Sequence, residues 1–375
     1  MSERLFLSPP DVGQLEAIAV SNAVNSGWVA PLGPEVDAFE EEMREYTGAG
    51  FTLAVSSGTA ALHLALLSVG VKPGDIVLVP TMTFAATVNA VLYCGALPHF
   101  IDCEISTGNI DVTLLAKALE EATSTNRRIA ALISVDLFGK IVDIPRISEF
   151  CQQNEIPWIS DSAESVGSKR GEINSGNFSD VSVFSFNGNK VMTTSGGGML
   201  LSNNSELIET SRHLSTQARV PAIHYEHDAV GFNYRMSNIL AALGRVQLSR
   251  LDSMIARRRE IRKRYSMFLS EIPGLDILGS EFDEGDNCWL TGILFDTNYF
   301  SQTPSQISLS LEAENIETRP LWKPMHLQTI FSNYSSTLNG NSQSLFNSGI
   351  VLPSGSTMTD DEVDKVIRSI VRIVH

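Results

Sequence analysis

The chain has 375 residues, of which 43% are hydrophobic and 19% charged, and its formal net charge is −16. This composition is typical of a soluble globular protein, and the length exceeds the size at which one hydrophobic core keeps growing, so two domains are expected. The acidic charge argues against nucleic acid and anionic membranes as partners, and no apolar run reaches the roughly 18 residues of a membrane span. The first ten residues contain no apolar signal-peptide region, so a cytoplasmic location is the default expectation.

The beginning of the chain predicts two helices, then a strand that runs into a third helix. Residues 11–26 have amphipathic spacing, and a stiff loop with two glycines and two prolines, residues 27–34, leads to a helix from Val36 to Tyr46. A short apolar strand then reaches an Ala/Leu-rich helix through Ser57, Gly58 and Thr59. Free N–H groups and the positive dipole end make the beginning of that helix a ready phosphate site. Serine and threonine are also common helix caps, so the motif alone leaves both functions open.

Short apolar strands then alternate with helices, which indicates a parallel sheet covered on both faces. Ligands bind such sheets at the carboxyl ends of the strands, and no strand end here carries the G-x-G-x-x-G pattern of a dinucleotide site. The predicted strands are residues 76–79, 97–101, 129–135 and 158–160, and the helices between them are residues 84–94, 112–122 and 144–153. The residues at the strand ends are Ser57, Thr83, Phe84, Asp136 and Asp161.

One acid and one amine are expected to face each other across a pocket. Asp161 ends a buried strand, and Lys190 follows a second apolar strand, residues 181–186, and the turn of residues 187–189. The polar, glycine-rich residues 193–198 allow backbone to approach another group closely. A lysine that forms a Schiff base and a carboxylate that holds a pyridinium proton are what pyridoxal phosphate (PLP) chemistry requires. Each residue alone also fits a structural role, as a helix cap or a solvated turn residue.

The last part of the chain predicts a polar loop, residues 217–236, and a long arginine-rich helix, residues 237–269, that links two domains. The remainder is predicted to be α+β, with a late polar and aromatic cluster at residues 319–326 and a final helix from Asp360 to Val374. We place the domains at residues 1–248, the large PLP-binding domain, and residues 249–375, the smaller α+β domain.

Seven segments in one order along nearly the whole chain carry a family resemblance. They are SSGTAAL (56–62), PTMTFAATVNAVLYCGALPHFID (80–102), DSAESVGS (161–168), FSFNGNK (184–190), TTSGGGML (193–200), GFNYRMSN (231–238) and RPLWKPMH (319–326). With these segments the chain resembles the DegT/DnrJ family of PLP-dependent nucleotide-sugar aminotransferases. The FSFNGNK form and the WVAPLGP loop are most similar to enzymes that aminate carbon 4 of UDP-2-acetamido-2,6-dideoxy-4-keto-hexoses, the UDP-N-acetylbacillosamine type. The implied fold is α/β of the aspartate aminotransferase-like fold type I, with a mixed, mostly parallel sheet in the large domain.

The resemblance implies roles for individual residues. Lys190 would be the Schiff-base lysine, Asp161 the partner of the pyridine nitrogen, and Phe84 would stack on the ring. Glu164 stands where many members have glutamine or histidine, and an ionised glutamate there would oppose a phenolate. The residues expected to bind the cofactor are Gly58, Thr59, Ala60, Phe84, Asp161, Glu164, Ser185, Lys190 and Asn233, the last from the second subunit of a homodimer with shared active sites.

A diphosphate-bearing acceptor needs a local cluster of cations, because the acidic chain repels it. Arginine suits phosphate through its fixed fork of donors, although each candidate also fits a surface charge or a structural pair. The expected substrate-binding residues are Pro31, Leu32, Asn187, Arg219, Arg235, Lys323 and His326.

The expected activity is amino transfer from an amino acid, L-glutamate by family expectation, to the keto carbon of such a UDP-sugar, for surface glycan biosynthesis. Another nucleotide-linked keto sugar (a dTDP or GDP sugar, or amination at carbon 3) and a non-catalytic PLP-binding regulatory protein remain alternatives. A third alternative is a family relative that uses PLP for dehydration, but such relatives have histidine in place of the lysine, and this chain keeps Lys190. No metal is expected, since the cysteines fit neither a zinc site nor a disulfide framework. They are Cys94, Cys103, Cys151 and Cys288.

Overall fold

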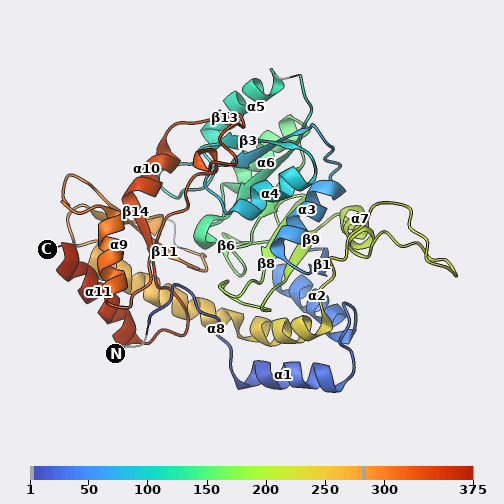
Figure 1. Cartoon of the computed structure of the whole chain (residues 1–375), viewed down its shortest axis with the longest axis horizontal. Coiled ribbons are helices and arrows are strands. Elements are labelled where there is room, and N and C mark those ends of the chain that lie inside the picture. Colours follow the sequence, from blue (N-terminus) through green and yellow to red (C-terminus); the bar gives the residue numbers. More distant parts are fainter. Residues whose placement is uncertain (1–3, 125, 281–283, 375) are drawn as a thin grey trace.

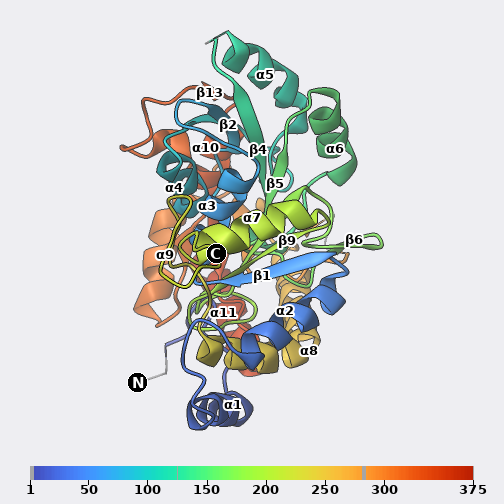
Figure 2. The same ribbon diagram turned by 90° about the vertical axis from the view of Figure 1, so that its right-hand side faces the viewer.

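The computed structural model describes residues 4–124, 126–280 and 284–374. Figure 1 shows two sheets with one long helix, α8 (Asn238–Leu269), running beneath both of them. In Figures 1 and 2, α1 (Gln14–Asn25) is the outermost helix and lies against α8. No helix within the described ranges combines the length and the apolar character needed to cross a membrane.

An eight-stranded sheet forms the larger part of the molecule. Its order is β1-β9-β8-β5-β4-β2-β3-β13; β9 is antiparallel to both of its neighbours, whereas the strands from β8 to β13 are parallel. The sheet is therefore mixed and mostly parallel, which confirms the predicted fold class. The strands are β1 (Phe51–Val55), β2 (Ile76–Pro80), β3 (Leu97–Ile101), β4 (Ile129–Val135), β5 (Trp158–Asp161), β8 (Val181–Ser185), β9 (Gly198–Ser202) and β13 (Ser336–Thr337).

Helices cover both faces of this sheet, so its central strands are buried throughout their length. In β2, Val77 and Val79 pack with α3 and α4, whereas Ile76 and Leu78 pack on the opposite face with α5 and α6. Alternate residues of a strand point to opposite faces, and both faces are apolar here because neither one meets water. The covering helices are α2 (Pro34–Thr47), α3 (Gly58–Ser68), α4 (Ala85–Tyr93), α5 (Leu115–Thr123), α6 (Ile144–Gln153) and α7 (Ser205–Ser215).

A four-stranded antiparallel sheet, β10-β11-β14-β12, forms the core of the C-terminal part. Residues 336–337 of this part form β13 and extend the large sheet beside β3. The predicted domain boundary after residue 248 falls inside α8 and stays a prediction. The elements are β10 (Leu275–Ile277), β11 (Thr291–Phe295), α9 (Pro304–Ala313), β12 (Arg319–Pro320), α10 (Asn341–Ser348), β14 (Gly349–Leu352) and α11 (Asp360–Val374); a small hairpin, β6 (Lys169–Arg170) and β7 (Ile173–Asn174), precedes β8.

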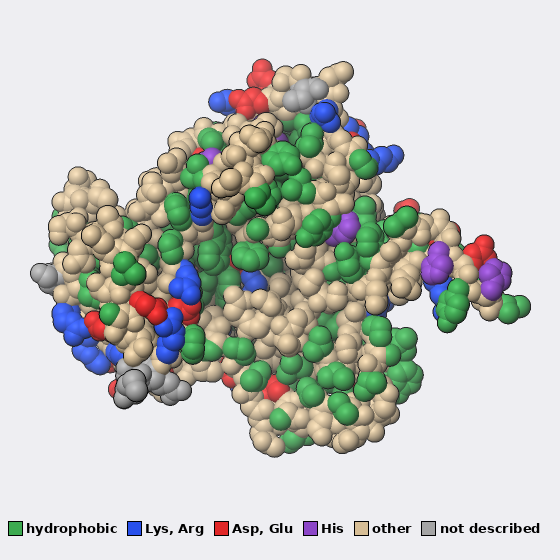
Figure 3. All heavy atoms as spheres, in the orientation of Figure 1, with side chains coloured by type: hydrophobic (Ala, Val, Ile, Leu, Met, Phe, Trp, Pro, Cys, Tyr) green, Lys and Arg blue, Asp and Glu red, His purple; other side chains and the backbone are tan. Residues whose placement is uncertain are grey.

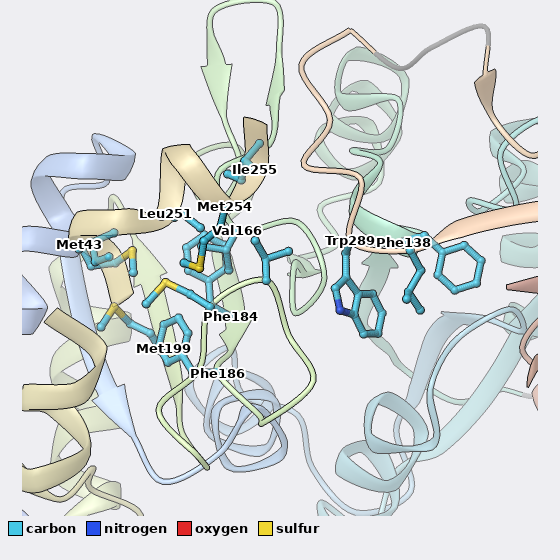
Figure 4. Packing of buried hydrophobic residues seen from close by; sticks show 14 of the residues in the cluster. Met43, Phe138, Val166, Phe184, Phe186, Met199, Leu251, Met254, Ile255 and Trp289 are labelled. Carbon is cyan, nitrogen blue, oxygen red and sulfur yellow. The ribbon is translucent and has the colours of Figure 1, made fainter. Parts of the chain in front are cut away.

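One apolar cluster joins α8 to the large sheet. Figure 4 shows Leu251 and Met254 of α8 packed with Met43 of α2 and Phe184 of β8. The buried side chains recur every three to four residues along α8, so one stripe of the helix faces the interior from its beginning to its end. Helix α8 therefore connects the two sheets by packing as well as by sequence.

Candidate active site

A cavity of about 300 Å³ lies at the carboxyl ends of the parallel strands. Figure 3 shows the molecule hollowed in the middle of one face, between the helices of the large sheet and the C-terminal part. Strand ends line the cavity because Val135, Asp161 and Ser185 finish β4, β5 and β8. The predicted site residues in its wall are Gly58, Thr59, Phe84, Asp161, Glu164, Ser185, Asn187 and Lys190.

Asp161 is buried and held at both carboxylate oxygens. Thr87 Oγ1 donates to Oδ2 at 2.6 Å, and the N–H of Ala163 donates to Oδ1 at 3.2 Å. Burial raises the pKa of the Asp161 carboxyl, while the Thr87 hydrogen bond and the charge of Lys190 lower it. A carboxylate fixed in this way favours a protonated, positively charged ring nitrogen beside it.

Lys190 shares the cavity with Asp161 and with a second buried acid. Its Nζ lies 3.5 Å from Glu164 Oε1 and 3.9 Å from the ring centroid of Trp289. The N–H of Phe138 donates to Glu164 Oε2 at 2.7 Å. Burial raises the pKa of the Glu164 carboxyl, and the charge of Lys190 and the Phe138 N–H oppose that rise. Acid and amine, predicted to meet in one pocket, thus line the same cavity.

The beginning of α3 offers donors to an anion. The N–H groups of Gly58 and Thr59 have no protein acceptor among the described residues, as expected for the first turn of a helix. A Cβ on Gly58 would lie 2.9 Å from Ser185 Cβ, and a Cβ on Gly198 would lie 2.6 Å from the Gly58 nitrogen. Gly198 requires glycine because strand β9 and the beginning of α3 approach each other backbone to backbone, whereas a side chain at Gly58 would press on Ser185 of β8.

These residues fit PLP. Two buried carboxylates, Asp161 and Glu164, face the single ammonium group of Lys190, so a ligand with a protonated ring nitrogen supplies a missing positive charge. The free N–H groups at the beginning of α3 and the nearby Ser185 hydroxyl suit a phosphate. Phe84, 65% exposed, stands at the cavity wall with its ring free to pack on a flat ligand.

Two predicted residues are engaged elsewhere in this chain. Ala60 donates its N–H to Ser57 Oγ at 3.0 Å, so it offers no free donor to the cavity. Arg235 donates to Glu40 Oε1 at 2.8 Å and to the carbonyl of Ala54, and it does not line the cavity. Its guanidinium is therefore not a free phosphate ligand in this chain.

His326 also lies outside the cavity wall. Its Nδ1 is 2.7 Å from Thr81 Oγ1, and burial lowers the pKa of the imidazole. Lys323 is exposed and lines a neighbouring groove.

Four predicted residues lie on exposed segments outside the cavity. Asn233 and Arg219 belong to the arm, which we define as residues 217–236 and which projects from the body after α7 (Figure 1). The Arg219 guanidinium carbon lies 4.4 Å from the ring centroid of Tyr225. Pro31 and Leu32 are exposed in the loop before α2. None of these four residues is in the wall of the active-site cavity.

The sequence did not reveal the two tryptophans of the cavity, Trp289 and Trp322. Trp289 donates its indole N–H to the carbonyl of Asn189 at 2.6 Å, and Figure 4 shows it beside Phe138. Trp322 belongs to the segment of residues 319–326, which carries part of the family resemblance. That resemblance was the one sequence signal that could have placed Trp322 at the site. No sequence signal placed Trp289 at the site, because its segment reaches the cavity only through the packing of the second sheet.

Comparison with known proteins identifies the family. The model of the DegT/DnrJ/EryC1/StrS aminotransferase family matches residues 10–371. EpsN of Bacillus subtilis (strain 168), provisionally named a pyridoxal phosphate-dependent aminotransferase, is 44% identical over 379 residues, which cover 100% of this chain and 97% of the relative. GDP-perosamine synthase of Vibrio cholerae is 34% identical, with 96% of each chain covered. Helicobacter pylori PseC, an aminotransferase involved in the biosynthesis of pseudoaminic acid, superposes with a TM-score of 0.92 at 25% identity, with 99% of each chain covered. The chain therefore belongs to the DegT/DnrJ/EryC1/StrS family and is a PLP-dependent sugar aminotransferase.

Proposed function

We propose that the chain transfers the amino group of L-glutamate to the keto carbon of a nucleotide-linked sugar. The preferred acceptor in this proposal is a UDP-linked 2-acetamido-2,6-dideoxy-4-keto-hexose, aminated at carbon 4. The observation that carries the proposal is the placement of Lys190 with two buried carboxylates in one cavity that is also lined by free N–H donors. A GDP-linked acceptor is the second candidate, because a GDP-perosamine synthase is 34% identical over 96% of the chain.

Each group in the cavity has a task in such a transfer. When bound, PLP supplies an aldehyde that takes up the amino group and a ring that accepts an electron pair. Asp161, fixed by Thr87, keeps the proton on the ring nitrogen, and Gly58, Thr59 and Ser185 hold the phosphate. Lys190 Nζ is the only amine in the cavity wall within the described part of the chain, so it carries the proton to and from the reacting carbon.

A second subunit completes the site in this proposal. Asn233 would reach the phosphate, and Arg219, Pro31 and Leu32 would contact the acceptor, all from the partner. The exposed apolar side chains on the arm, Ile223, Tyr225 and Val230, support a contact with another copy. We also expect a cytoplasmic location and use of the product in polysaccharide biosynthesis.

Two experiments test the proposal. The wild-type enzyme is incubated with L-glutamate and a panel of UDP-, GDP- and dTDP-linked keto sugars, and the aminated product is detected by mass. Lys190→Ala should abolish turnover and the absorbance of the bound cofactor at roughly 400 nm. A variant that kept the wild-type rate would refute the role of Lys190, and an unreactive panel would refute the acceptor class.

A further inference from the structure

A short segment of the C-terminal part, residues 286–289, contributes Trp289 to the wall of the active-site cavity. Asn287 of this segment is fully buried, and its Nδ2 donates to the carbonyls of Glu164 and Val166 at 2.8 and 2.9 Å. Its Oδ1 accepts the backbone N–H of Trp289 at 2.9 Å. The side chain of Asn287 therefore fixes the backbone of Trp289 to the loop that carries both acids of the cavity.

The backbone of this segment has a conformation that residues other than glycine rarely adopt. Cys288 is buried and has a φ of +53°, in the left-handed region. Such a conformation costs free energy and persists where the surrounding contacts fix it. The residues on either side of Cys288, which are Asn287 and Trp289, make those contacts.

Trp289 holds Lys190 at two points. The centroid of its ring lies 3.9 Å from Lys190 Nζ, within the range of a cation–π contact. Its indole N–H donates at 2.6 Å to the carbonyl of Asn189, which belongs to the peptide group that leads into Lys190. The ring therefore positions the tip of the lysine side chain, and the indole N–H positions the backbone from which that side chain starts.

The turn before Lys190 has few other fixed points. Asn187 and Asn189 are exposed, and the other hydrogen bonds of residues 187–189, among the residues that the structure describes, are with residues 185–190. A lysine side chain is long and flexible, so holding it in one geometry costs conformational entropy. Contacts that already hold the amine before the cofactor binds remove that cost from the reaction.

We propose that Trp289 is a positioning residue for Lys190 and holds the lysine amine where the cofactor aldehyde must arrive. The ammonium group first loses a proton, which Glu164 Oε1 at 3.5 Å can accept, and the nitrogen then joins the aldehyde carbon as one water is released. Trp289 contributes position alone and exchanges no atom in this reaction. The inference rests on the proposed role of Lys190 and extends it to a residue of the C-terminal part.

The first test measures how fast Lys190 captures the cofactor. PLP is mixed with the cofactor-free enzyme, and the rate constant is taken from the rise in absorbance at roughly 400 nm. Trp289→Leu, which lacks both the aromatic face and the N–H, should lower this rate constant by at least about tenfold. Trp289→Phe, which keeps an aromatic face, should lower it by about threefold. A merely structural effect would reduce the amplitude, through the folded fraction, and leave the rate constant unchanged.

Trp158→Phe is the matched control. Trp158 is also buried and donates its indole N–H to Ser134 Oγ at 2.9 Å, but it lies outside the wall of the active-site cavity. This variant should keep the wild-type rate constant. A wild-type rate constant in Trp289→Leu, or equal slowing in Trp158→Phe and Trp289→Phe, would overturn the inference.

The second test uses tryptophan fluorescence and needs no cofactor. An ammonium group against an indole face perturbs the emission of that indole, so Lys190→Met should change the fluorescence of the cofactor-free enzyme. In a Trp289→Phe background the same substitution should cause a much smaller change, and equal changes in both backgrounds would overturn the inference. If the absorbance at roughly 400 nm instead develops in Lys190→Ala, the proposed function loses its Schiff-base lysine, and the fluorescence comparison still decides the contact with Trp289.

Discussion

Glu164 gives the cavity a second acid directly beside the amine of Lys190. Its two carboxylate oxygens have different neighbours, the Phe138 N–H on one side and Lys190 Nζ on the other. A carboxylate in this position favours a positively charged group beside it. We therefore propose that Glu164 would act on the protonation of the bound cofactor more than on its position.

Replacing Glu164 with glutamine should lower the midpoint pH of the absorbance change of the bound cofactor by about one unit, because the charge that stabilises the protonated form is gone. The measurement is a spectrophotometric pH titration of the holoenzyme. Glu149→Gln, on the exposed side of α6, is the matched control. An unchanged midpoint in Glu164→Gln would mean that this carboxyl carries a proton in the holoenzyme and does not act through charge.

At the scale of the element, one buried carboxylate holds the loop that carries both acids of the cavity. Asp136 Oδ2 accepts hydrogen bonds from Ser162 Oγ at 2.8 Å and from Ser165 Oγ at 2.7 Å. These serines directly follow Asp161 and Glu164. Burial raises the pKa of Asp136 to about 7, although the two serine hydroxyls lower it.

This pKa predicts a pH-dependent stability. Between about pH 4 and pH 7 the folded protein keeps the Asp136 proton that the unfolded chain has released, so the free energy of unfolding falls as pH rises, by about 3 to 4 kcal/mol from this group. Asp136→Asn removes that dependence. Its deficit in the free energy of unfolding relative to wild type should be smaller at pH 8 than at pH 5, as measured by urea denaturation. Asp276→Asn, exposed in β10, is the control for the loss of a carboxylate. An equal deficit at both pH values would contradict the raised pKa.

The strands, the helices and the central residues of the site could be predicted from the sequence, because they depend on local patterns. Asp161 and Lys190 each follow an apolar run, and such runs had to lie in one sheet with their carboxyl ends at one edge. The pairing of Arg235 with Glu40 joins residues 195 positions apart and leaves no local signal. Strand β13 has only two residues, which is too short for any periodicity to appear.

At the scale of the whole molecule, the arm and the loop before α2 leave part of the predicted site outside the cavity of this chain. A dimer with shared sites makes a specific prediction. Lys190→Ala and Asn233→Ala, each impaired alone, should recover about one quarter of wild-type activity when mixed in equal amounts and allowed to exchange subunits, since half of the dimers then contain one intact site. The measurement is turnover before and after exchange. Activity that stays at the mean of the two variants would show that Asn233 serves its own subunit.

Gly198 has a consequence for attempts to alter this enzyme by random mutagenesis. Any side chain there would meet the main chain of Ser57 and Gly58, which cannot turn aside as a flexible side chain can. In a library with all twenty amino acids at this position, a screen for formation of the aminated sugar should return only glycine. Neighbouring sites that face the ligand should meanwhile diversify when the acceptor is changed. In this region, the number of tolerated substitutions therefore depends on the space between neighbouring main chains and not on the distance from the ligand.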